Sequence, residues 1–221
     1  MKTITQTINL YTFEELSEKA KRKALEKWCQ SDDYPWYDDN KNTLDEFVKH
    51  FDFIDSTNWE YGGCYRYAKC TIDTPYEYDI YLEDLAGISL YTFIQNYMEK
   101  FKVYKTYALN GENIYIAKKK YQSKIAWSYE NDCQLTGYCL DCEIMQPIFD
   151  YLENFPKHQN KTLGELMNEC LTHWVVACES DHDYYYSMDC LEEYATDNDI
   201  YFYEDGRFYG ELREKIAWWI K

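Results

Sequence analysis

The sequence predicts an α+β protein with a short antiparallel sheet and several flanking helices. Apolar residues recur at helical spacing in several segments, and shorter aromatic segments alternate as β-strands do. Helices and strands do not follow the regular βαβ order of a parallel sheet. No Gly-, Pro- or Ser-rich linker divides the 221 residues, so we expect a single compact domain over 1–221. The candidate points of subdivision are 105–112 and 156–161.

The N-terminal part is expected to form a strand and two helices. Residues 4–10 alternate in part and predict a short strand. Thr-Phe-Glu-Glu at 12–15 has the spacing of a capping box, and the apolar residues that follow predict a helix over 13–30. The polar and aromatic residues 31–42 predict a loop. A second capping box opens a predicted helix over 43–51.

The middle of the chain is expected to hold the sheet and one helix. Residues 59–71 are aromatic and alternating, with Gly62-Gly63 at a turn, and residues 78–82 resemble another strand. Helical spacing predicts a helix over 88–104. Asn-Gly at 110–111 indicates a turn after a weak strand.

The C-terminal part is expected to be mainly helical. Helical spacing predicts a helix over 140–155, and a third capping box predicts a helix over 162–178. A further helix is expected within 181–199. Asp-Gly between aromatic segments predicts a hairpin over 200–209, and the amphipathic residues 212–220 predict a closing helix.

The charge of the chain limits its partners. With 40 acidic and 23 basic residues, the net charge is −17. Binding DNA or RNA requires Lys and Arg to replace counterions, and anionic membrane surfaces repel an acidic protein. A basic partner is therefore favoured, and we expect no direct nucleic-acid or membrane ligand. The alternative is that the acidity serves solubility alone.

The acidic residues are also segregated from the basic ones. No Lys or Arg occurs from Thr162 to Gly206, from Cys70 to Glu99, or from Ile125 to Pro156, while basic residues gather at 19–27 and 118–124. An ordinary surface intersperses both signs, so this segregation indicates a directed field. The predicted partner-binding residues lie in the longest segment without bases: Glu179, Asp181, Asp183, Tyr184, Tyr185, Tyr186, Asp189, Glu192, Glu193, Asp197, Asp199, Glu204 and Asp205.

The tyrosines within this segment are candidate anchors. Tyrosine provides contact area at protein interfaces at a low entropic cost, which favours a contact role for residues 184–186. The alternative is that tyrosine fills strands and half-buried faces, as we expect for most of the 25 tyrosines in this chain.

The cysteines do not define a metal site. Nine cysteines without a secretory leader are expected to be thiols. Cys139 and Cys142 form a CxxC pair and Cys133 precedes it, but zinc needs a fourth ligand. Zinc binding by these three remains open, and small buried side chains are the favoured interpretation. The carboxylates of 181–193 lack EF-hand spacing. We therefore expect no metal or other cofactor.

No catalytic motif is present, so we expect a protein that is not an enzyme. The phosphate-binding, zinc-protease and nucleophile-elbow motifs are all missing. Cys178 has His173 and His182 nearby in sequence, but Glu179 and Asp181 beside it would raise a thiol pKa. The chain has no apolar segment of about 18 residues and no signal peptide at its start, so we expect a soluble intracellular protein.

Two segments near the chain ends carry a family resemblance. They are INLYTFEELSEKAKRKALEKW at 8–28 and NDIYFYEDGRFY at 198–209. They resemble a family of uncharacterised acidic phage and prophage proteins that begin with Y-[ST]-F-x-E-L-S-x-x-A-K-x-K-A and end near F-x-x-D-G-R. The resemblance brings no catalytic residue. It implies a mobile-element origin, and proteins of this class are similar to anti-CRISPR or anti-restriction inhibitors that imitate DNA.

The leading hypothesis is therefore a phage-encoded inhibitor of a host defence nuclease, such as a CRISPR effector, acting in the host cytoplasm. Its carboxylates would occupy the basic channel in which an effector holds nucleic acid. The alternatives are a Cys- or metal-dependent enzyme, and a regulatory phage protein that binds another basic partner.

Overall fold

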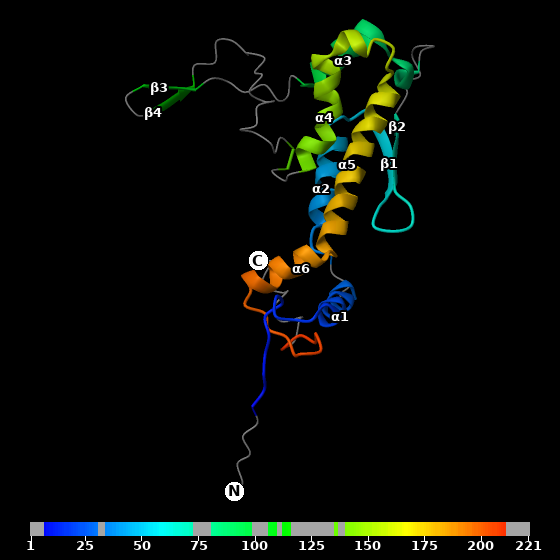
Figure 1. Ribbon diagram of the computed structural model, residues 1–221. Coiled ribbons are helices and arrows are strands. Elements are labelled where there is room, and N and C mark those ends of the chain that lie inside the picture. The colour runs from blue at the N-terminus through cyan, green and yellow to red at the C-terminus, as the bar shows by residue number, and fades with distance from the viewer. Residues whose placement is uncertain are drawn as a thin grey trace. The chain divides into compact units, whose positions relative to one another are not determined.

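The computed structural model describes residues 7–30, 34–72, 81–98, 106–109, 112–115, 135–136 and 140–210. They form an α+β protein with short antiparallel sheets, as the sequence predicts (Figure 1). The chain divides into two compact units: Met1–Tyr37 with Ser180–Lys221, and Asp38–Glu179. Neither boundary falls at the points of subdivision considered from the sequence, and the first unit is assembled from both ends of the chain.

The first unit is built on α1 (Glu18–Cys29) and α6 (Met188–Asp197), which contact each other. Its core combines the buried face of α1 with side chains from α6 and from the segments that flank both helices. The largest contributions come from aromatic rings, among them Trp28, Tyr185 and Phe202. The apolar spacing that predicted α1 is thus the spacing of its buried residues, Ala20, Ala24 and Trp28.

The start of α1 differs from the prediction. The backbone of Thr12 does donate to the Glu15 carboxylate at 2.8 Å, but residues 13–16 form a turn. The N-cap of α1 is Ser17, whose hydroxyl accepts from the backbone N–H of Ala20 at 3.3 Å. The turn places Phe13 and Leu16 in the core, so burial overrides the upstream capping box. Residues 7–10 form no strand, and only Tyr11 makes an isolated bridge, to Phe202.

The predicted C-terminal hairpin is a turn with isolated bridges rather than a pair of strands. The backbone N–H of Tyr203 donates to the Arg207 carbonyl at 2.8 Å, and Phe202 bridges Phe208. Gly206 has a φ of +85°, in the left-handed region, and its Cα lies against the backbone of Ala20 in α1. A Cβ at this glycine would lie 2.1 Å from the Ala20 carbonyl oxygen.

We therefore expect Gly206→Ala to destabilise the first unit by about 2–5 kcal/mol. The left-handed conformation costs about 1–2 kcal/mol for alanine, and the clash with Ala20 adds about 1–3 kcal/mol. Gly210→Ala is the matched control, because Gly210 has a φ of +92° but no atom within 4 Å of its Cβ position. Thermal unfolding followed by circular dichroism measures both. Equal losses for the two variants would mean that the hairpin does not depend on this close approach.

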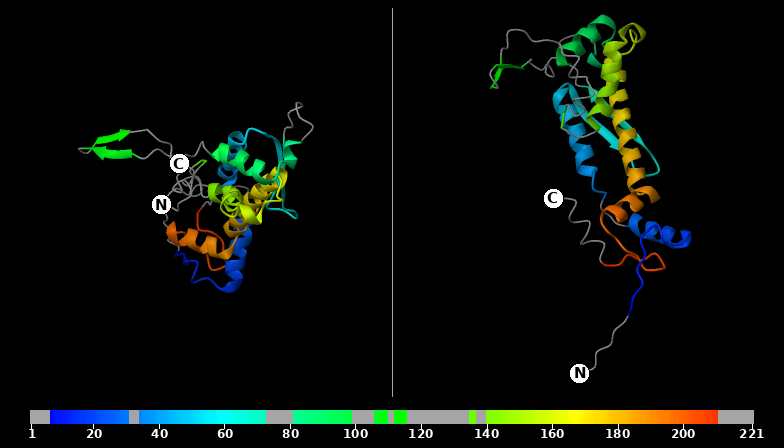
Figure 2. Two further views of the ribbon diagram at one scale, coloured as in Figure 1. Left: turned by 90° about the horizontal axis from the view of Figure 1, so that it is seen from above. Right: turned by 60° about the vertical axis from the view of Figure 1, so that its left-hand side comes forward.

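The second unit packs four helices and a β-hairpin around one core. Its elements are α2 (Tyr37–His50), β1 (Ile54–Glu60), β2 (Tyr67–Ile72), α3 (Gly87–Met98), α4 (Leu140–Glu153) and the greater part of α5 (Leu163–Tyr185). α2, α4 and α5 run alongside one another, and the hairpin lies beside α5 (Figures 1 and 2). The Trp174 indole donates to the Asn40 carbonyl at 3.0 Å and meets the Trp59 ring edge to face, linking α5 to α2 and β1.

The predicted start of α2 is wrong. The helix begins at Tyr37, within the segment expected to be a loop, and Thr43 lies inside it rather than at its N-cap. The Thr43 side chain is buried and its hydroxyl donates to Asp141 at 3.3 Å. In a capping box the Thr43 hydroxyl would accept from the helix backbone. Here it is bound instead to Asp141 of α4, 98 positions further along the chain.

The antiparallel pair predicted over 59–71 is confirmed as β1 and β2, with Trp59 opposite Ala68 and β1 starting earlier, at Ile54. A second antiparallel pair joins β3 (Thr106–Leu109) to β4 (Glu112–Tyr115). Leu82–Asp84 is a short 3-10 helix rather than the end of a strand. The strand expected at 78–82 otherwise lies outside the described residues.

α3, α4 and α5 agree with the prediction at their starts. α3 and α4 begin within one residue of the expected positions. The third capping box is complete: the Thr162 backbone N–H donates to Glu165 at 2.9 Å, and the Glu165 N–H donates to the Thr162 hydroxyl at 3.2 Å. α5 continues past 178 to Tyr185. The helix expected over 212–220 lies outside the described residues.

Candidate partner-binding surface

The end of α5 and the start of α6 arise from a break in the helix predicted over 181–199. Ser187 has an extended backbone, and its hydroxyl accepts from the Cys190 N–H at 3.2 Å, which makes it the N-cap of α6. Leu191 and Ala195 then form the buried face of α6. Residues 189, 193 and 197 are spaced four apart and lie on the opposite face, so three carboxylates point to solvent.

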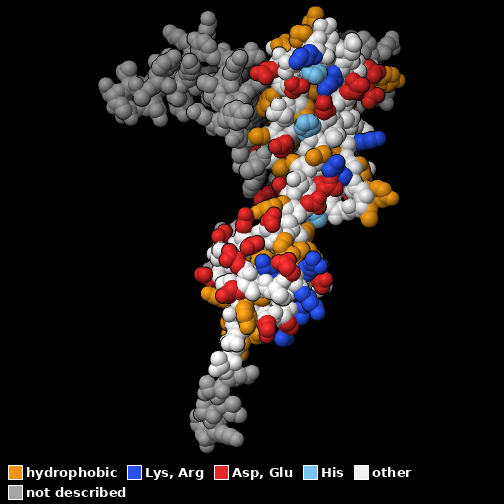
Figure 3. All heavy atoms as spheres, in the orientation of Figure 1, with side chains coloured by type: hydrophobic (Ala, Val, Ile, Leu, Met, Phe, Trp, Pro, Cys, Tyr) orange, Lys and Arg blue, Asp and Glu red, His pale blue; other side chains and the backbone are white. Residues whose placement is uncertain are grey.

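The carboxylates around α6 form a surface that is poor in compensating cations. We define the acidic face as Asp183, Tyr184, Asp189, Glu192, Glu193, Asp197 and Asp199. All are exposed except Glu192, which is half-buried. Among the described residues, no Lys or Arg forms an ion pair with any member of this face. Figure 3 shows the carboxylates gathered over α6 and the basic side chains of this unit over α1.

Most of this arrangement costs helix stability, although Asp189 in the first turn of α6 is placed favourably at the positive end of the helix dipole. Asp189 and Glu193 are four residues apart, as are Glu193 and Asp197, and like charges at this spacing repel by about 0.2–0.5 kcal/mol per pair. Asp197 also lies in the last turn of α6, next to the negative end of the helix dipole. α6 contains no basic residue to offset either effect. The face is therefore not explained by the stability of the helix that carries it.

Tyr184 is the tyrosine of the triplet that reaches this surface. Its hydroxyl donates to the Glu193 carboxylate, which ties the end of α5 to α6. This hydrogen bond to a carboxylate raises the pKa of the phenol to about 12, so the hydroxyl stays protonated at neutral pH. The exposed aromatic ring thus lies among carboxylates, as the sequence analysis expected.

Tyr185 does not belong to the surface, in contrast to the prediction that it binds a partner. Its side chain is 5% exposed and packs against Trp28, Tyr34 and Trp36. Its carbonyl accepts from the Trp28 indole at 2.8 Å. Tyr186 is half-buried against the same cluster. Consecutive helix positions point in different directions, so three adjacent tyrosines cannot all face a partner.

Two of the predicted partner-binding carboxylates form ion pairs with cations of this same chain. Asp205 accepts from the Lys23 amine at 3.0 Å and from the Arg207 side chain at 2.9 Å. These cations lower the pKa of Asp205 to about 2, with the Lys23 hydrogen bond as the main cause, so it is a fully charged structural anion at neutral pH. Glu179 belongs to the second unit and pairs with Arg66 of the hairpin. Each of these carboxylates thus has a cationic partner within the chain, unlike those of α6.

Two further residues that were predicted to bind a partner, Glu204 and Asp181, lie outside the acidic face. Glu204 is exposed at the hairpin turn, and Asp181 is half-buried in the last turns of α5. The structure therefore brings together about half of the predicted site residues on and around α6.

Several acidic residues of the second unit have partners within the protein, although Glu143 and Glu153 of α4 form no described ion pair. Asp141 is fully buried, and its carboxylate accepts hydrogen bonds around the start of α4. Asp150 meets His158 at 3.0 Å, and Glu169 pairs with Lys161. The carboxylates of 73–79 and 125–136, which are Asp73, Glu77, Asp79, Glu130 and Asp132, lie outside the described residues. Asp141, Asp150 and Glu169 thus differ from the carboxylates of the acidic face, because each is held by a partner within the second unit.

Of the cysteines considered for metal binding or catalysis, Cys142 and Cys178 lie within the described residues. In this part of the chain, no three His, Cys, Asp or Glu side chains come together as a metal site. Cys142 lies half-buried in α4, while Cys133 and Cys139 lie outside the described residues. Cys178, considered as a nucleophile, is fully buried in the core of the second unit. No helix in the described ranges is long and apolar enough to span a bilayer.

No known protein family, no curated protein and no solved structure matches this chain. The fold and surface define an α+β protein whose most distinctive feature is a set of exposed carboxylates that no described Lys or Arg neutralises.

Proposed function

We propose that this protein is a phage-encoded inhibitor that binds a host defence nuclease, such as a CRISPR effector, through the acidic face. It acts in the host cytoplasm by occupying a basic nucleic-acid channel and is not itself an enzyme. The observation that carries the proposal is that the carboxylates of α6 are exposed and make no ion pair with a described Lys or Arg. Buried or paired carboxylates would have little to offer a basic partner.

The charge density of α6 supports the comparison with nucleic acid. At about 1.5 Å per residue, positions 189 to 197 span about 12 Å of helix axis and carry four carboxylates. This is about one charge per 3–4 Å, close to the roughly 3.4 Å per phosphate along one DNA strand. A channel that binds a phosphate backbone through Lys and Arg would therefore meet a similar linear density of negative charge.

Removing carboxylates from α6 should have opposite effects on partner binding and on folding stability, because these carboxylates destabilise the helix. We expect Glu193→Gln/Asp197→Asn to weaken binding at least about tenfold, because close charge pairs across interfaces contribute about 1.5 kcal/mol or more each. The same variant should gain about 1 kcal/mol of folding stability, since it removes two like-charge pairs and a carboxylate at the helix C-terminus. The amide that replaces the Glu193 carboxylate keeps an oxygen that can accept the Tyr184 hydrogen bond.

The matched control is Glu143→Gln/Glu153→Gln. Both glutamates are exposed on α4, one in its first turn and one at its last residue, and neither forms a described ion pair. This control changes the net charge by the same amount and should change binding little. Equal weakening by both double variants would assign the effect to net charge rather than to the acidic face.

The partner is tested with purified protein against a panel of RNA-guided and restriction nucleases. Capture and inhibition of cleavage are measured at about 50 mM and 300 mM salt, each with guide RNA or target DNA present or absent. The proposal expects one nuclease to be captured and inhibited, with binding that salt weakens steeply and DNA competes away. Binding that DNA does not compete would contradict occupation of the channel. No capture of any nuclease at low salt would contradict the inhibitor function.

A further inference from the structure

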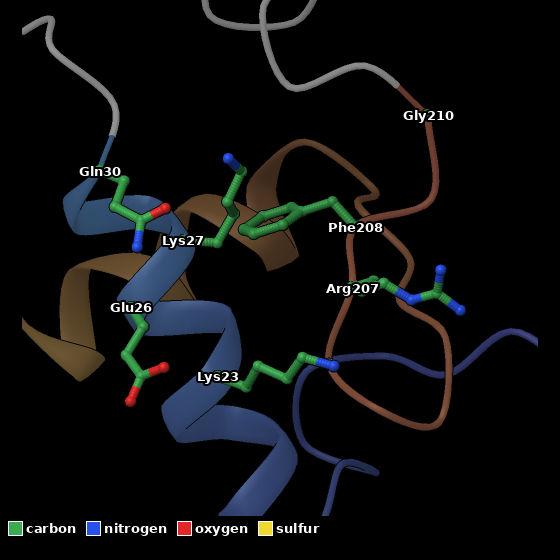
Figure 4. Close-up of a pocket in the computed structure, with 8 residues that line it drawn as sticks. Lys23, Glu26, Lys27, Gln30, Arg207, Phe208 and Gly210 are labelled. Carbon is green, nitrogen blue, oxygen red and sulfur yellow. The ribbon is translucent and has the colours of Figure 1, made fainter.

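We propose that the first unit binds a small nucleoside phosphate in a basic pocket between α1 and the C-terminal hairpin. The pocket has a volume of about 480 Å³. Its lining combines cations with one aromatic ring: Lys23, Glu26, Lys27, Gln30, Gly206, Arg207, Phe208 and Gly210. Figure 4 shows that the side chains come from one face of α1 and from the hairpin that follows α6.

The lining of this pocket is richer in cations than the rest of the chain, although the Asp205 carboxylate beside it contacts two of them. Three cations and one carboxylate line it, in a protein with a net charge of −17. Lys27 forms no ion pair with any described residue. Its amine is therefore the cation most available to an anion. In Figure 4 the Glu26 carboxylate points away from Phe208, so it does not occupy the same place as the Lys27 amine.

The other two cations, Lys23 and Arg207, are held in position by Asp205. Asp205 contacts the Lys23 amine at 3.0 Å and the Arg207 Nε at 2.9 Å. The Lys23 amine has three N–H donors, so it keeps donors for a ligand. The Arg207 guanidinium has five, but it lies over the Tyr203 ring, 5.2 Å from its centroid, and points away from Phe208 in Figure 4. A phosphate can accept several such hydrogen bonds at once.

The aromatic ring and the size of the pocket select among anions. Phe208 packs on Phe202 with ring centroids 4.8 Å apart, and its remaining surface forms an apolar wall of the pocket. Gln30 adds an amide that can donate and accept at the edge of a ring. Pockets of about 300–1,000 Å³ hold small ligands, so this volume suits a mononucleotide better than a lone phosphate.

A free nucleotide fits better than the end of a nucleic-acid strand. A mononucleotide brings a phosphate charge of about −2, whereas each added residue of a strand brings a further negative charge. The chain carries 17 more acidic than basic residues, and the nine carboxylates from 181 to 205 belong to this same unit. Repulsion therefore increases with strand length, while the pocket supplies only three cations.

The test is equilibrium dialysis of the full chain with adenosine 5′-monophosphate, adenosine, ribose 5-phosphate and an oligonucleotide with a 5′-phosphate. We expect saturable binding of adenosine 5′-monophosphate. Adenosine alone and ribose 5-phosphate alone should each bind at least tenfold more weakly. Lys27→Gln should weaken binding at least fivefold, and Glu26→Gln should strengthen it. Lys19→Gln is the control, because Lys19 is exposed on α1 but does not line the pocket.

Several outcomes would overturn the proposal. One is that the chain shows no saturable binding of adenosine 5′-monophosphate at millimolar concentration. Another is that the Lys27→Gln variant binds it as tightly as the unchanged chain does. A third is that ribose 5-phosphate binds as tightly as the monophosphate. Tighter binding of the oligonucleotide would overturn the assignment to a free nucleotide. Phe208→Leu keeps an apolar side chain and should weaken the monophosphate while leaving ribose 5-phosphate unchanged. Thermal unfolding of each variant verifies that the chain is folded.

Discussion

Replacing Trp28 by alanine is expected to unfold the first unit. The indole is 1% exposed and packs against Tyr185 and Tyr194, with ring centroids 5.1 and 4.9 Å away. Truncating a buried tryptophan costs about 3–5 kcal/mol, through lost contacts and the cavity that remains. This is a large part of the roughly 5–15 kcal/mol that stabilises a typical protein. The expected result is loss of hydrogen-exchange protection in α1 and α6, measured peptide by peptide.

A second variant separates packing from hydrogen bonding. Trp28→Phe keeps most of the ring but removes the N–H that donates to the Tyr185 carbonyl at 2.8 Å. Leaving that buried carbonyl without its donor costs about 1–3 kcal/mol, less than the alanine variant. Lys19→Ala, on the exposed side of the same helix, should have little effect. If Trp28→Ala left α1 and α6 fully protected, the aromatic cluster would not be what stabilises this unit.

Replacing Asp141 by alanine is expected to destabilise the second unit by about 3–5 kcal/mol, the usual cost of removing one partner from a buried charged network. The carboxylate is fully buried. It accepts from the backbone N–H groups of Leu135 and Thr136, both at 2.7 Å, and from the Thr136 hydroxyl at 2.8 Å. It also links α4 to α2 through Thr43. Urea unfolding followed by circular dichroism measures the loss.

The Asp141→Asn variant should be less harmful. The asparagine side chain would keep the shape and one accepting oxygen, and the two threonine hydroxyls could rotate to accept from its amide. It would lose the additional strength of hydrogen bonds to a charged acceptor, so we expect a loss of about 1–2 kcal/mol. Glu143→Ala tests an exposed acidic residue two positions further along α4. If Asp141→Ala were no more harmful than this control, the buried hydrogen bonds would not contribute to stability.

The sequence was most informative where structure depends on neighbouring residues. The capping box at 162–165 placed the start of α5 because both of its hydrogen bonds join residues three apart. Alternation over 59–71 predicted a hairpin that pairs residues close in the chain. The same kind of box misplaced α1 and α2. Phe13 and Thr43 are buried in the core, and this burial outweighs the local capping pattern. A pattern of neighbouring residues does not reveal such burial.

The candidate surface was predicted in outline. The long segment without Lys or Arg is visible in the sequence, and it does contain α6 with its exposed carboxylates. Asp141 was counted only as one more negative charge. Its place in the first turn of a predicted helix, where carboxylates satisfy free N–H groups, was the available indication of a structural role.

The sequence by itself determined the α+β class, most of the helices, the net charge and the separation of acidic from basic residues. Only the tertiary structure decided which carboxylates are exposed and which are paired with cations of the same chain. Asp205 is neutralised by Lys23, 182 positions away, and Asp141 is bound by Thr43, 98 positions away. Tyr185 is buried by rings from the N-terminal segment. Charge and helical period are properties of short segments, whereas pairing and burial depend on contacts between segments that only folding brings together.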